Sequence, residues 1–275
     1  MMDLVKSPLN YTGGKFLLIP QIVKLFPQKI HCFVDLFGGG FNVGVNVPQA
    51  HLLLYNDISE SVKSILEALY SFGADSAENR IKETLITYKL NNADAAYAER
   101  ETAFYNLRQS YNKEPTWDKL FCLMACSFNN QIRFNQRGEF NVPYGDRGFN
   151  SSMRSNLRQF TFRMQSWFVT FHCKDFRKVE LPENCFVYLD PPYFGAKAAY
   201  NGDWDYESEY CLWEYVEDLD RQGIRFALSN NLRYYNKLLN LNKDKYNIHY
   251  LTADYSNCNY QRRGGVDCEV LITNY

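Results

Sequence analysis

The sequence predicts an α/β fold, and three observations lead to this prediction. Two short apolar segments near the start, His31–Leu36 and Leu52–Asn56, have the length and composition of buried strands. Three glycines, Gly38–Gly40, form a turn after the first segment, and Ser59 caps a helix after the second. Strand-like segments return beyond residue 166. Strands that alternate with helices in this way are typical of a sheet covered by helices.

The remaining elements follow from their own local patterns. Phe41–Val47 is predicted to be a short helix. The helix that begins after Ser59 has Glu60 in its first turn and is predicted to run to about Tyr70. Five later strands are predicted from apolar segments. These strands are Trp167–His172, Cys185–Leu189, Arg225–Ser229, Tyr246–Leu251 and Asp267–Thr273.

A change of pattern divides the chain. In residues 75–128 the apolar positions recur at helical spacing and strand patterns are absent. The polar segment Asn129–Gly145 is predicted to be a hairpin or an extended loop. We therefore predict a main domain of residues 1–74 and 146–275, interrupted by a mainly helical subdomain, residues 75–145.

Length and composition exclude several classes of protein. The chain has 275 residues, 46% of them hydrophobic, which is enough for a full core. No apolar run approaches the roughly 18 residues that span a bilayer, so we expect a cytoplasmic protein without a membrane partner. Eight cysteines are scattered without CxxC pairs, and four histidines lack ligand spacing, so we expect reduced thiols and no metal. The sequence leaves the oligomeric state open, with a monomer or a weak dimer expected.

Charge is distributed unevenly along the chain. The net charge is only −1, but the segment Asn129–Arg163 holds six arginines against Glu139 and Asp146, a local balance of +4. The arginines are Arg133, Arg137, Arg147, Arg154, Arg158 and Arg163. A basic segment with interleaved aromatic residues in a nearly neutral protein predicts a nucleic-acid surface.

The tetrapeptide Asp190-Pro191-Pro192-Tyr193 directly follows the predicted strand Cys185–Leu189. The two prolines end the strand in a rigid turn because neither has a backbone N–H to donate. Ligands of open α/β sheets bind beyond the carboxyl ends of the strands, where this turn would lie. Asp190 and the carbonyl of Pro191 offer acceptors for the N–H groups of an exocyclic amine, and Tyr193 offers a ring on which a base can stack.

Other motifs near the start are suited to holding a ligand. Asp35 and the glycine turn end the first strand, and consecutive glycines let a ligand approach the backbone closely. Asp57 closes the second strand, where an acid is well placed to hold ribose hydroxyls. The segment Tyr11-Thr12-Gly13-Gly14-Lys15 lacks the spacing of a phosphate-binding loop, so Lys15 is expected to face a carboxylate of the ligand.

Together these motifs resemble the Dam-type adenine methyltransferases, the D12 class. The segments that carry the resemblance follow the family order: Tyr11–Lys15, Asp35–Gly40, Asn56-Asp57, Arg137–Gly145, Asp190–Tyr193 and Glu269–Tyr275. The resemblance covers nearly the whole chain. It implies a Rossmann-like methyltransferase sheet, S-adenosylmethionine as cofactor, double-stranded DNA as partner and a target-recognition role for the inserted subdomain.

The resemblance also assigns roles to individual positions. It implies catalytic roles for Asp190, Pro191, Pro192 and Tyr193. It implies cofactor contacts for Tyr11, Lys15, Asp35, Gly38, Gly40, Asp57, Asp175, Phe176 and Asp190, with Asp175-Phe176 beside the cofactor adenine. It implies DNA contacts for Asn129, Gln131, Arg133, Arg137, Asn141, Pro143 and Arg147.

Two of these DNA contacts carry an expectation about the target. Arg133 matches the arginine with which the family reads the guanine before the target adenine, and Pro143 matches the contact to the thymine methyl. A target containing GAT is therefore favoured, with GATC as the simplest full site. Gln131 stands where Dam inserts an apolar residue, and Tyr11 stands where Dam has tryptophan.

Competing functions differ in what they need from the sequence. A cytosine C5 methyltransferase needs a cysteine nucleophile, usually after a proline, and no proline here precedes a cysteine. N4-cytosine methylation shares the amine chemistry, although Asp rather than Ser at position 190 favours adenine. A catalytically silent DNA-binding regulator would show an eroded catalytic turn, and this turn is intact. The sequence leaves open whether a restriction nuclease or a phage is involved.

Overall fold

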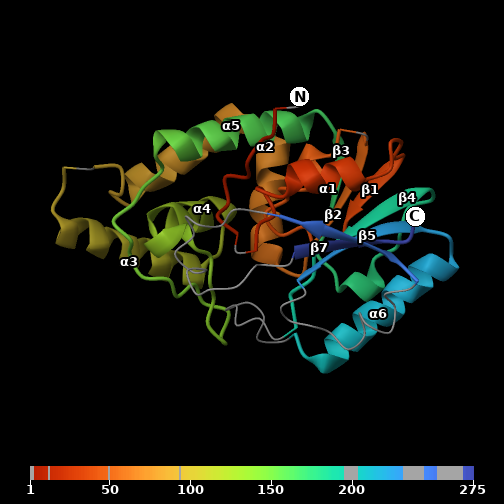
Figure 1. Ribbon diagram of the computed structural model, residues 1–275. Helices are drawn as coiled ribbons and strands as arrows, with labels where there is room; N and C mark the ends of the chain where they lie inside the picture. Colours follow the sequence, from red (N-terminus) through yellow and green to blue (C-terminus); the bar gives the residue numbers. More distant parts are fainter. Residues whose placement is uncertain are drawn as a thin grey trace.

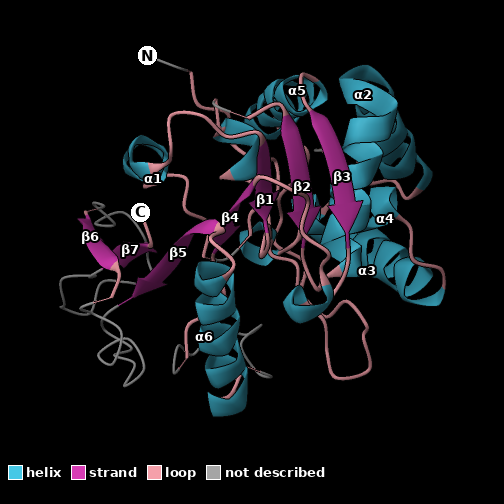
Figure 2. Cartoon of the chain, turned by 90° about the vertical axis from the view of Figure 1, so that its right-hand side faces the viewer, coloured by secondary structure: helices cyan, strands magenta, loops and turns pink. Residues whose placement is uncertain are grey.

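One seven-stranded sheet organises the structure, with the strand order β3-β2-β1-β4-β5-β7-β6 (Figure 2). The structure is a computed structural model that describes residues 3–11, 13–48, 50–92, 94–194, 204–231, 245–252 and 269–275. The strands are β1 (Cys32–Asp35), β2 (Leu52–Asn56), β3 (Phe168–His172), β4 (Cys185–Leu189), β5 (Arg225–Asn231), β6 (Asn247–Leu251) and β7 (Glu269–Thr273). Strand β7 pairs antiparallel with β5 and β6, and the other pairings are parallel.

Helices lie on both faces of the sheet and extend beyond one edge of it (Figure 1). The α-helices are α1 (Ile19–Leu25), α2 (Glu60–Thr87), α3 (Tyr97–Lys113), α4 (Trp117–Cys126), α5 (Ser151–Gln165) and α6 (Tyr206–Arg221). Three single 3-10 turns are η1 (Gly44–Asn46), η2 (Phe128–Asn130) and η3 (Phe176–Lys178). In Figure 1, α3 and α4 lie at the left, away from the strands, and α6 lies at the lower right.

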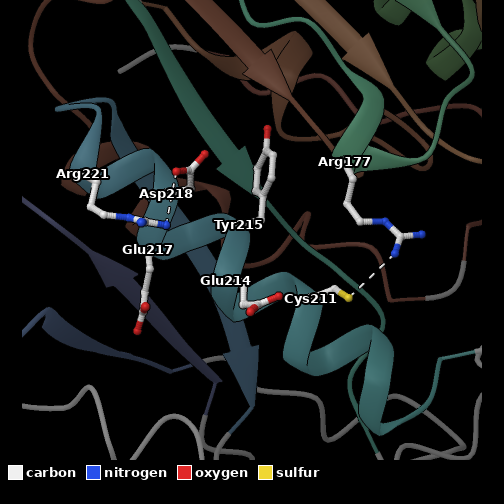
Figure 3. Close-up of a pocket in the computed structure, with 7 residues that line it drawn as sticks. All are labelled: Arg177, Cys211, Glu214, Tyr215, Glu217, Asp218 and Arg221. Atoms are coloured by element: carbon white, nitrogen blue, oxygen red, sulfur yellow. Dashed lines mark hydrogen bonds and ion pairs between the residues drawn. The ribbon is translucent and has the colours of Figure 1, made fainter.

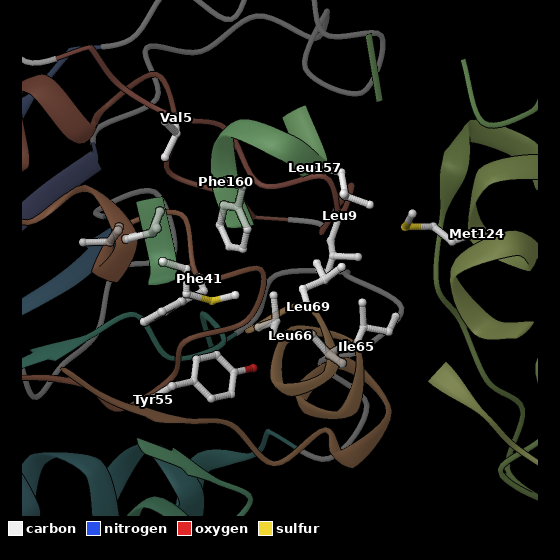
Figure 4. Close-up of a cluster of buried hydrophobic side chains, with 14 of the residues drawn as sticks. Val5, Leu9, Phe41, Tyr55, Ile65, Leu66, Leu69, Met124, Leu157 and Phe160 are labelled. Atoms are coloured by element: carbon white, nitrogen blue, oxygen red, sulfur yellow. The ribbon is translucent and has the colours of Figure 1, made fainter. Parts of the chain in front are cut away.

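Two apolar cores hold the layers together because the central strands are buried on both faces. Strands β1 and β4 are buried along their whole length, as is typical of parallel strands covered by helices. One core includes Tyr55 and Phe160 and continues to Met124 of α4 (Figure 4). The other core includes Val187 and packs the opposite face of the sheet against Trp213 of α6.

The predicted strands are confirmed, whereas one predicted helix needs correction. Strand β4 has the predicted bounds, and the other strands agree to within two residues; the predicted start at Asp267 lies outside the described residues. The helix predicted over Phe41–Val47 is wrong in extent because Phe41 has a left-handed φ of 59°, which leaves only η1. Helix α2 has a non-helical kink at Gly73, with φ 76° and ψ 168°, so its first part ends close to the predicted Tyr70 and its second part runs to Thr87.

The second half of α2 packs against α4 and α5 as part of the predicted helical segment. Glu78 is only 5% exposed and forms ion pairs with Lys82, Arg154 and Arg158. Both arginines belong to α5, so Glu78 links α2 to α5 through ion pairs. Arg154 and Arg158 thus neutralise an acid of the same chain, so these two arginines add less positive charge to the predicted basic surface than the sequence suggests.

The segment after α4 folds as the predicted hairpin. Isolated bridges join Phe134 to Phe140 and Ser127 to Tyr144, and the turn contains Gly138 with a left-handed φ of 76°. At the base of the hairpin, the N–H of Gly145 donates to the carbonyl of Cys126 at 2.9 Å. The backbones are so close here that a Cβ on Gly145 would lie 2.4 Å from the carbonyl of Ser127.

Three observations bear on membrane, metal and disulfide chemistry. No helix in the described ranges is long and apolar enough to cross a membrane. Among the same residues, no three His, Cys, Asp or Glu side chains come together as ligands for a metal ion. The six described cysteines are free, and four of them are buried.

The substitution Gly145→Ala tests the base of the hairpin. The new methyl group would overlap the backbone of Ser127, so we expect a loss of about 1–3 kcal/mol in the free energy of unfolding. The matched control is Gly148→Ala, where no atom lies within 4 Å of the added Cβ. We expect the control to stay within about 0.5 kcal/mol of wild type in urea unfolding. Equal effects of both substitutions would contradict this account of the hairpin.

Candidate active site

The predicted catalytic and cofactor-binding acids meet at one edge of the sheet. Parallel strands deliver their carboxyl ends to the same side, so Asp35 at the end of β1, Asp57 after β2 and Asp190 after β4 lie along one edge. The antiparallel strand β7 reaches this edge with its first residue, Glu269, which pairs in register with Asn231 at the end of β5. The edge thus collects polar side chains from five strands or strand ends.

The turn Asp190–Tyr193 is held by a buried ion pair. The ammonium of Lys15 lies 2.9 Å from the Asp190 carboxylate, and the two side chains are 6% and 18% exposed. The same ammonium lies 4.9 Å from the centroid of the Tyr193 ring, and it donates to the carbonyl of Gly13 at 3.1 Å. Pro191 is buried and Pro192 is half-buried. Lys15 therefore fixes both functional side chains of the turn.

The charge state of Asp190 results from opposing effects. Burial raises the pKa of Asp190 above its ordinary value, the ammonium of Lys15 lowers it, and the carboxylate of Glu269 raises it. The hydrogen bond from the Tyr193 hydroxyl also lowers the pKa of Asp190, but by less than Lys15 does. Lys15 thus favours the ionised acceptor form of Asp190.

The glycine turn is packed between two tyrosine rings. A Cβ on Gly38 would lie 2.4 Å from the Tyr55 ring, and a Cβ on Gly39 would lie 2.9 Å from the Tyr11 ring. Gly39 also has a left-handed φ of 48°. A Cβ on Gly40 would lie 3.2 Å from Tyr11. These contacts explain why larger residues do not fit in the turn, and they place Tyr11 against it.

Asp57 holds the glycine turn through a backbone hydrogen bond. One carboxylate oxygen accepts the N–H of Gly39 at 2.8 Å and the other accepts the N–H of Ser59 at 2.8 Å. Burial raises the pKa of Asp57, while these backbone donors lower it. Each carboxylate oxygen has a second lone pair, so the acid retains acceptor capacity for a ligand.

Asp35 is the most deeply buried acid of the edge. It is 2% exposed, and it accepts the N–H of Gly44 at 3.1 Å. The pKa of Asp35 is raised to about 8: burial has the largest effect, the Gly44 N–H lowers the pKa, and the nearby Asp190 and Asp57 raise it. At neutral pH the folded chain therefore keeps this side chain largely protonated.

An aromatic group adjoins the predicted position of Asp175-Phe176. The ring of Phe176 lies 5.2 Å from that of Phe37 and 6.2 Å from that of Trp204. Asp175 caps η3 and forms an ion pair with the guanidinium of Arg177, which lowers the pKa of Asp175. Figure 3 shows the same guanidinium directed at Cys211 of α6, where a surface pocket opens.

The hairpin presents several of the predicted DNA-binding residues. Arg133 is exposed, and its guanidinium donates to the side chain of Asn141 at 2.8 Å and to its carbonyl. Arg137, Pro143 and Arg147 are exposed as well, and Gln131 is half-exposed.

The start of the hairpin is connected to the N-terminal loop. Asn129 has a left-handed φ of 56°, and its carbonyl accepts the side-chain amide of Asn10 at 2.7 Å. Asn10 directly precedes Tyr11, so the loop that carries Tyr11 and Lys15 contacts the hairpin, the glycine turn and the catalytic turn.

Two polar residues of the site, Glu269 and Asn231, were not predicted from the sequence. Glu269 accepts the hydroxyl of Tyr193 at 2.8 Å and the side-chain amide of Asn231 at 3.0 Å. Glu269 stands at the head of an apolar strand, Val270 to Ile272, where an acid is unusual for a buried strand. That contrast was the available signal.

The sheet order and the acidic carboxyl edge define a Rossmann-like methyltransferase fold. The sequence profile described as D12 class N6 adenine-specific DNA methyltransferase matches residues 11–257. The chain therefore belongs to this family. Both the fold class and the family resemblance predicted from the sequence are confirmed.

Individual relatives cover the chain almost completely. Modification methylase StsI of Streptococcus sanguinis is 36% identical and Type II methyltransferase M.FokI of Planomicrobium okeanokoites is 38% identical, each over 98% of this chain. The chain spans less than half of these two proteins, 43% of each. DNA adenine methylase of Escherichia coli strain K12 is 26% identical over 81% of the chain and 80% of that protein.

The substitution Asp35→Asn tests the buried acid. Because the pKa of Asp35 is about 8 in the fold and near 4 in the unfolded chain, the folded state binds the extra proton between these values. Stability therefore falls as pH rises from 5 to 8, and the asparagine variant lacks this contribution. We expect the variant to gain more than about 1 kcal/mol relative to wild type over this interval. Urea unfolding at pH 5 and pH 8 measures the difference, and parallel pH dependences would contradict it.

Proposed function

We propose that this chain transfers a methyl group from S-adenosylmethionine to the exocyclic N6 of adenine in double-stranded DNA. The observation that carries the proposal is the turn Asp190–Tyr193, in which Lys15 pairs with the acid at 2.9 Å and lies over the tyrosine ring. Membership of the D12 family supports N6 of adenine over N4 of cytosine as the acceptor.

The residues of the edge fit the proposed cofactor. Asp57 retains acceptor capacity for ribose hydroxyls, and it holds the turn Gly38–Gly40 through the N–H of Gly39. Phe37 and Phe176 offer rings for an adenine, and Asp175 offers a carboxylate next to them. Tyr11, Lys15, Asp35 and Asp190 complete the proposed cofactor contacts. The cofactor supplies a methyl group that its sulfonium has already activated.

The catalytic turn would act on the amine of a base that has left the helix. The lone pair of the amine is delocalised into the purine, and acceptors for both N–H groups favour the geometry in which this pair can attack. Asp190 and the Pro191 carbonyl are suited to this role, and the Asp190 carboxylate stabilises the positive charge that develops on nitrogen. Stacking on Tyr193 compensates part of the cost of extruding the base.

Residues 75–145 are proposed to read the target, and residues 1–74 and 146–275 to bind the cofactor and catalyse transfer. Arg133 projects from the hairpin with its guanidinium steadied by Asn141, which suits a bidentate contact to guanine. We propose a target that contains GAT. Pro143 would contact the thymine methyl, Asn129 and Gln131 the opened base pair, and Arg137 and Arg147 the backbone.

A role in restriction and modification is the biological setting we propose. The relatives StsI and M.FokI carry the names of modification enzymes. Methylation by this chain would then protect DNA from a nuclease that cuts the same sequence.

The first test is a methyl-transfer assay with labelled S-adenosylmethionine and duplex DNA, followed by nucleoside analysis. We expect N6-methyladenine from wild type, no detectable product from Asp190→Ala and partial activity from Tyr193→Phe, which keeps the stacking ring. The matched control is Asp218→Ala, an exposed aspartate of α6 that pairs with Arg221. Wild-type rates from Asp190→Ala, or a product other than N6-methyladenine, would refute the proposal.

The second test concerns sequence reading. Loss of a bidentate arginine contact costs about 1–3 kcal/mol, so Arg133→Ala should reduce the preference for a guanine before the adenine by about 5- to 150-fold. Arg137→Ala on the same hairpin should weaken binding to all sequences to a similar degree. Sequencing of methylated bases in DNA exposed to each variant measures both. Unchanged guanine preference in Arg133→Ala would remove the assignment while leaving adenine methylation intact.

A further inference from the structure

Glu269 reaches the active site because of the direction of its strand. Strand β7 is antiparallel to β5, so its first residue lies beside the last residue of β5, Asn231, at the carboxyl edge. The side chain of Glu269 accepts the amide of Asn231 with one oxygen and the hydroxyl of Tyr193 with the other. The acid therefore joins the end of the sheet to the aromatic residue of the catalytic turn.

An acid at this position is costly for the fold. Glu269 is 9% exposed and is followed by three buried apolar residues, and a buried carboxylate loses hydration that only good partners replace. It also stands near Asp190, and its charge raises the pKa of that residue. Two carboxylates thus share the neighbourhood of Lys15. An apolar residue at position 269 would avoid both the loss of hydration and the charge beside Asp190. This indicates that the acid has a role in the active site.

The contact with Tyr193 shows what the acid does. Burial raises the pKa of Tyr193 well above its ordinary value, so the hydroxyl keeps its single proton and donates it. The hydroxyl lies 2.8 Å from Glu269 and 3.5 Å from Asp190, so it donates its main hydrogen bond to Glu269 and only a long one to Asp190. The short contacts of Asp190 are therefore with Lys15. The ring of Tyr193 is then fixed at its polar end by Glu269 and at its face by Lys15.

We propose that Glu269 is a positioning residue for methyl transfer: by accepting the Tyr193 hydroxyl it sets the plane of the ring on which the target adenine stacks, and it binds that hydroxyl more closely than Asp190 does. The inference rests on the proposed function.

The experiment compares Glu269→Ala, Tyr193→Phe and the double variant under single-turnover conditions. A charge-assisted hydrogen bond lost in the transition state corresponds to about a 10- to 30-fold fall in rate, which we expect for Glu269→Ala with the cofactor dissociation constant changed less than about 2-fold. In the Tyr193→Phe background the same substitution should cost less than about 3-fold, because the hydroxyl is already absent. Glu269→Gln keeps an oxygen for the hydroxyl and should restore the rate to within about 3-fold of wild type.

Two further measurements separate positioning from general damage to β7. Thr273→Val removes a buried hydroxyl at the far end of the same strand, and we expect it to leave the rate within about 2-fold of wild type. Fluorescence of 2-aminopurine at the target position reports on stacking of the extruded base, and we expect it to rise in Glu269→Ala. Equal losses from Glu269→Ala in the wild-type and Tyr193→Phe backgrounds would overturn the inference. A wild-type chain that transfers no methyl group would instead overturn the proposed function.

Discussion

The ion pair between Lys15 and Asp190 is the interaction on which the arrangement of the site depends. The acid lies at the end of a central buried strand, where ionisation is unfavourable, and the lysine comes from a loop far away in the sequence. Because the ammonium also lies on the Tyr193 ring, one cation orients both the polar and the aromatic part of the turn. Removing the lysine would leave a buried carboxylate next to a second acid, Glu269.

The sheet determines which residues can take part in this arrangement. Parallel strands bring Asp35, Asp57 and Asp190 to one edge, and the antiparallel strand β7 adds Glu269 from the opposite chain direction. Burial at this edge separates the acids by charge state. Asp35 is held largely protonated deep in the core, and Lys15 favours the ionised form of Asp190. Neighbouring carboxylates therefore have different tasks because their surroundings differ.

Local patterns predicted the strands and the motifs well, since apolar segments and proline turns are set by neighbouring residues. Strand β4 and the turn after it are examples. The errors arose where tertiary contacts decide. Phe41 has a left-handed backbone, so the helix predicted to begin there is reduced to a single 3-10 turn. Glu269 was missed because its partners, Asn231 and Tyr193, are close only after the strands have taken their order.

The contacts of the N-terminal loop provide a route by which the binding of one ligand can affect the binding of another. Asn10 bonds the hairpin at Asn129, Tyr11 lies on the glycine turn, and Lys15 holds Asp190. A ligand that orders this short loop at one end lowers the entropy still to be lost at the other. Such coupling is reciprocal. If the cofactor raises the affinity for DNA by some factor, DNA must raise the affinity for the cofactor by the same factor.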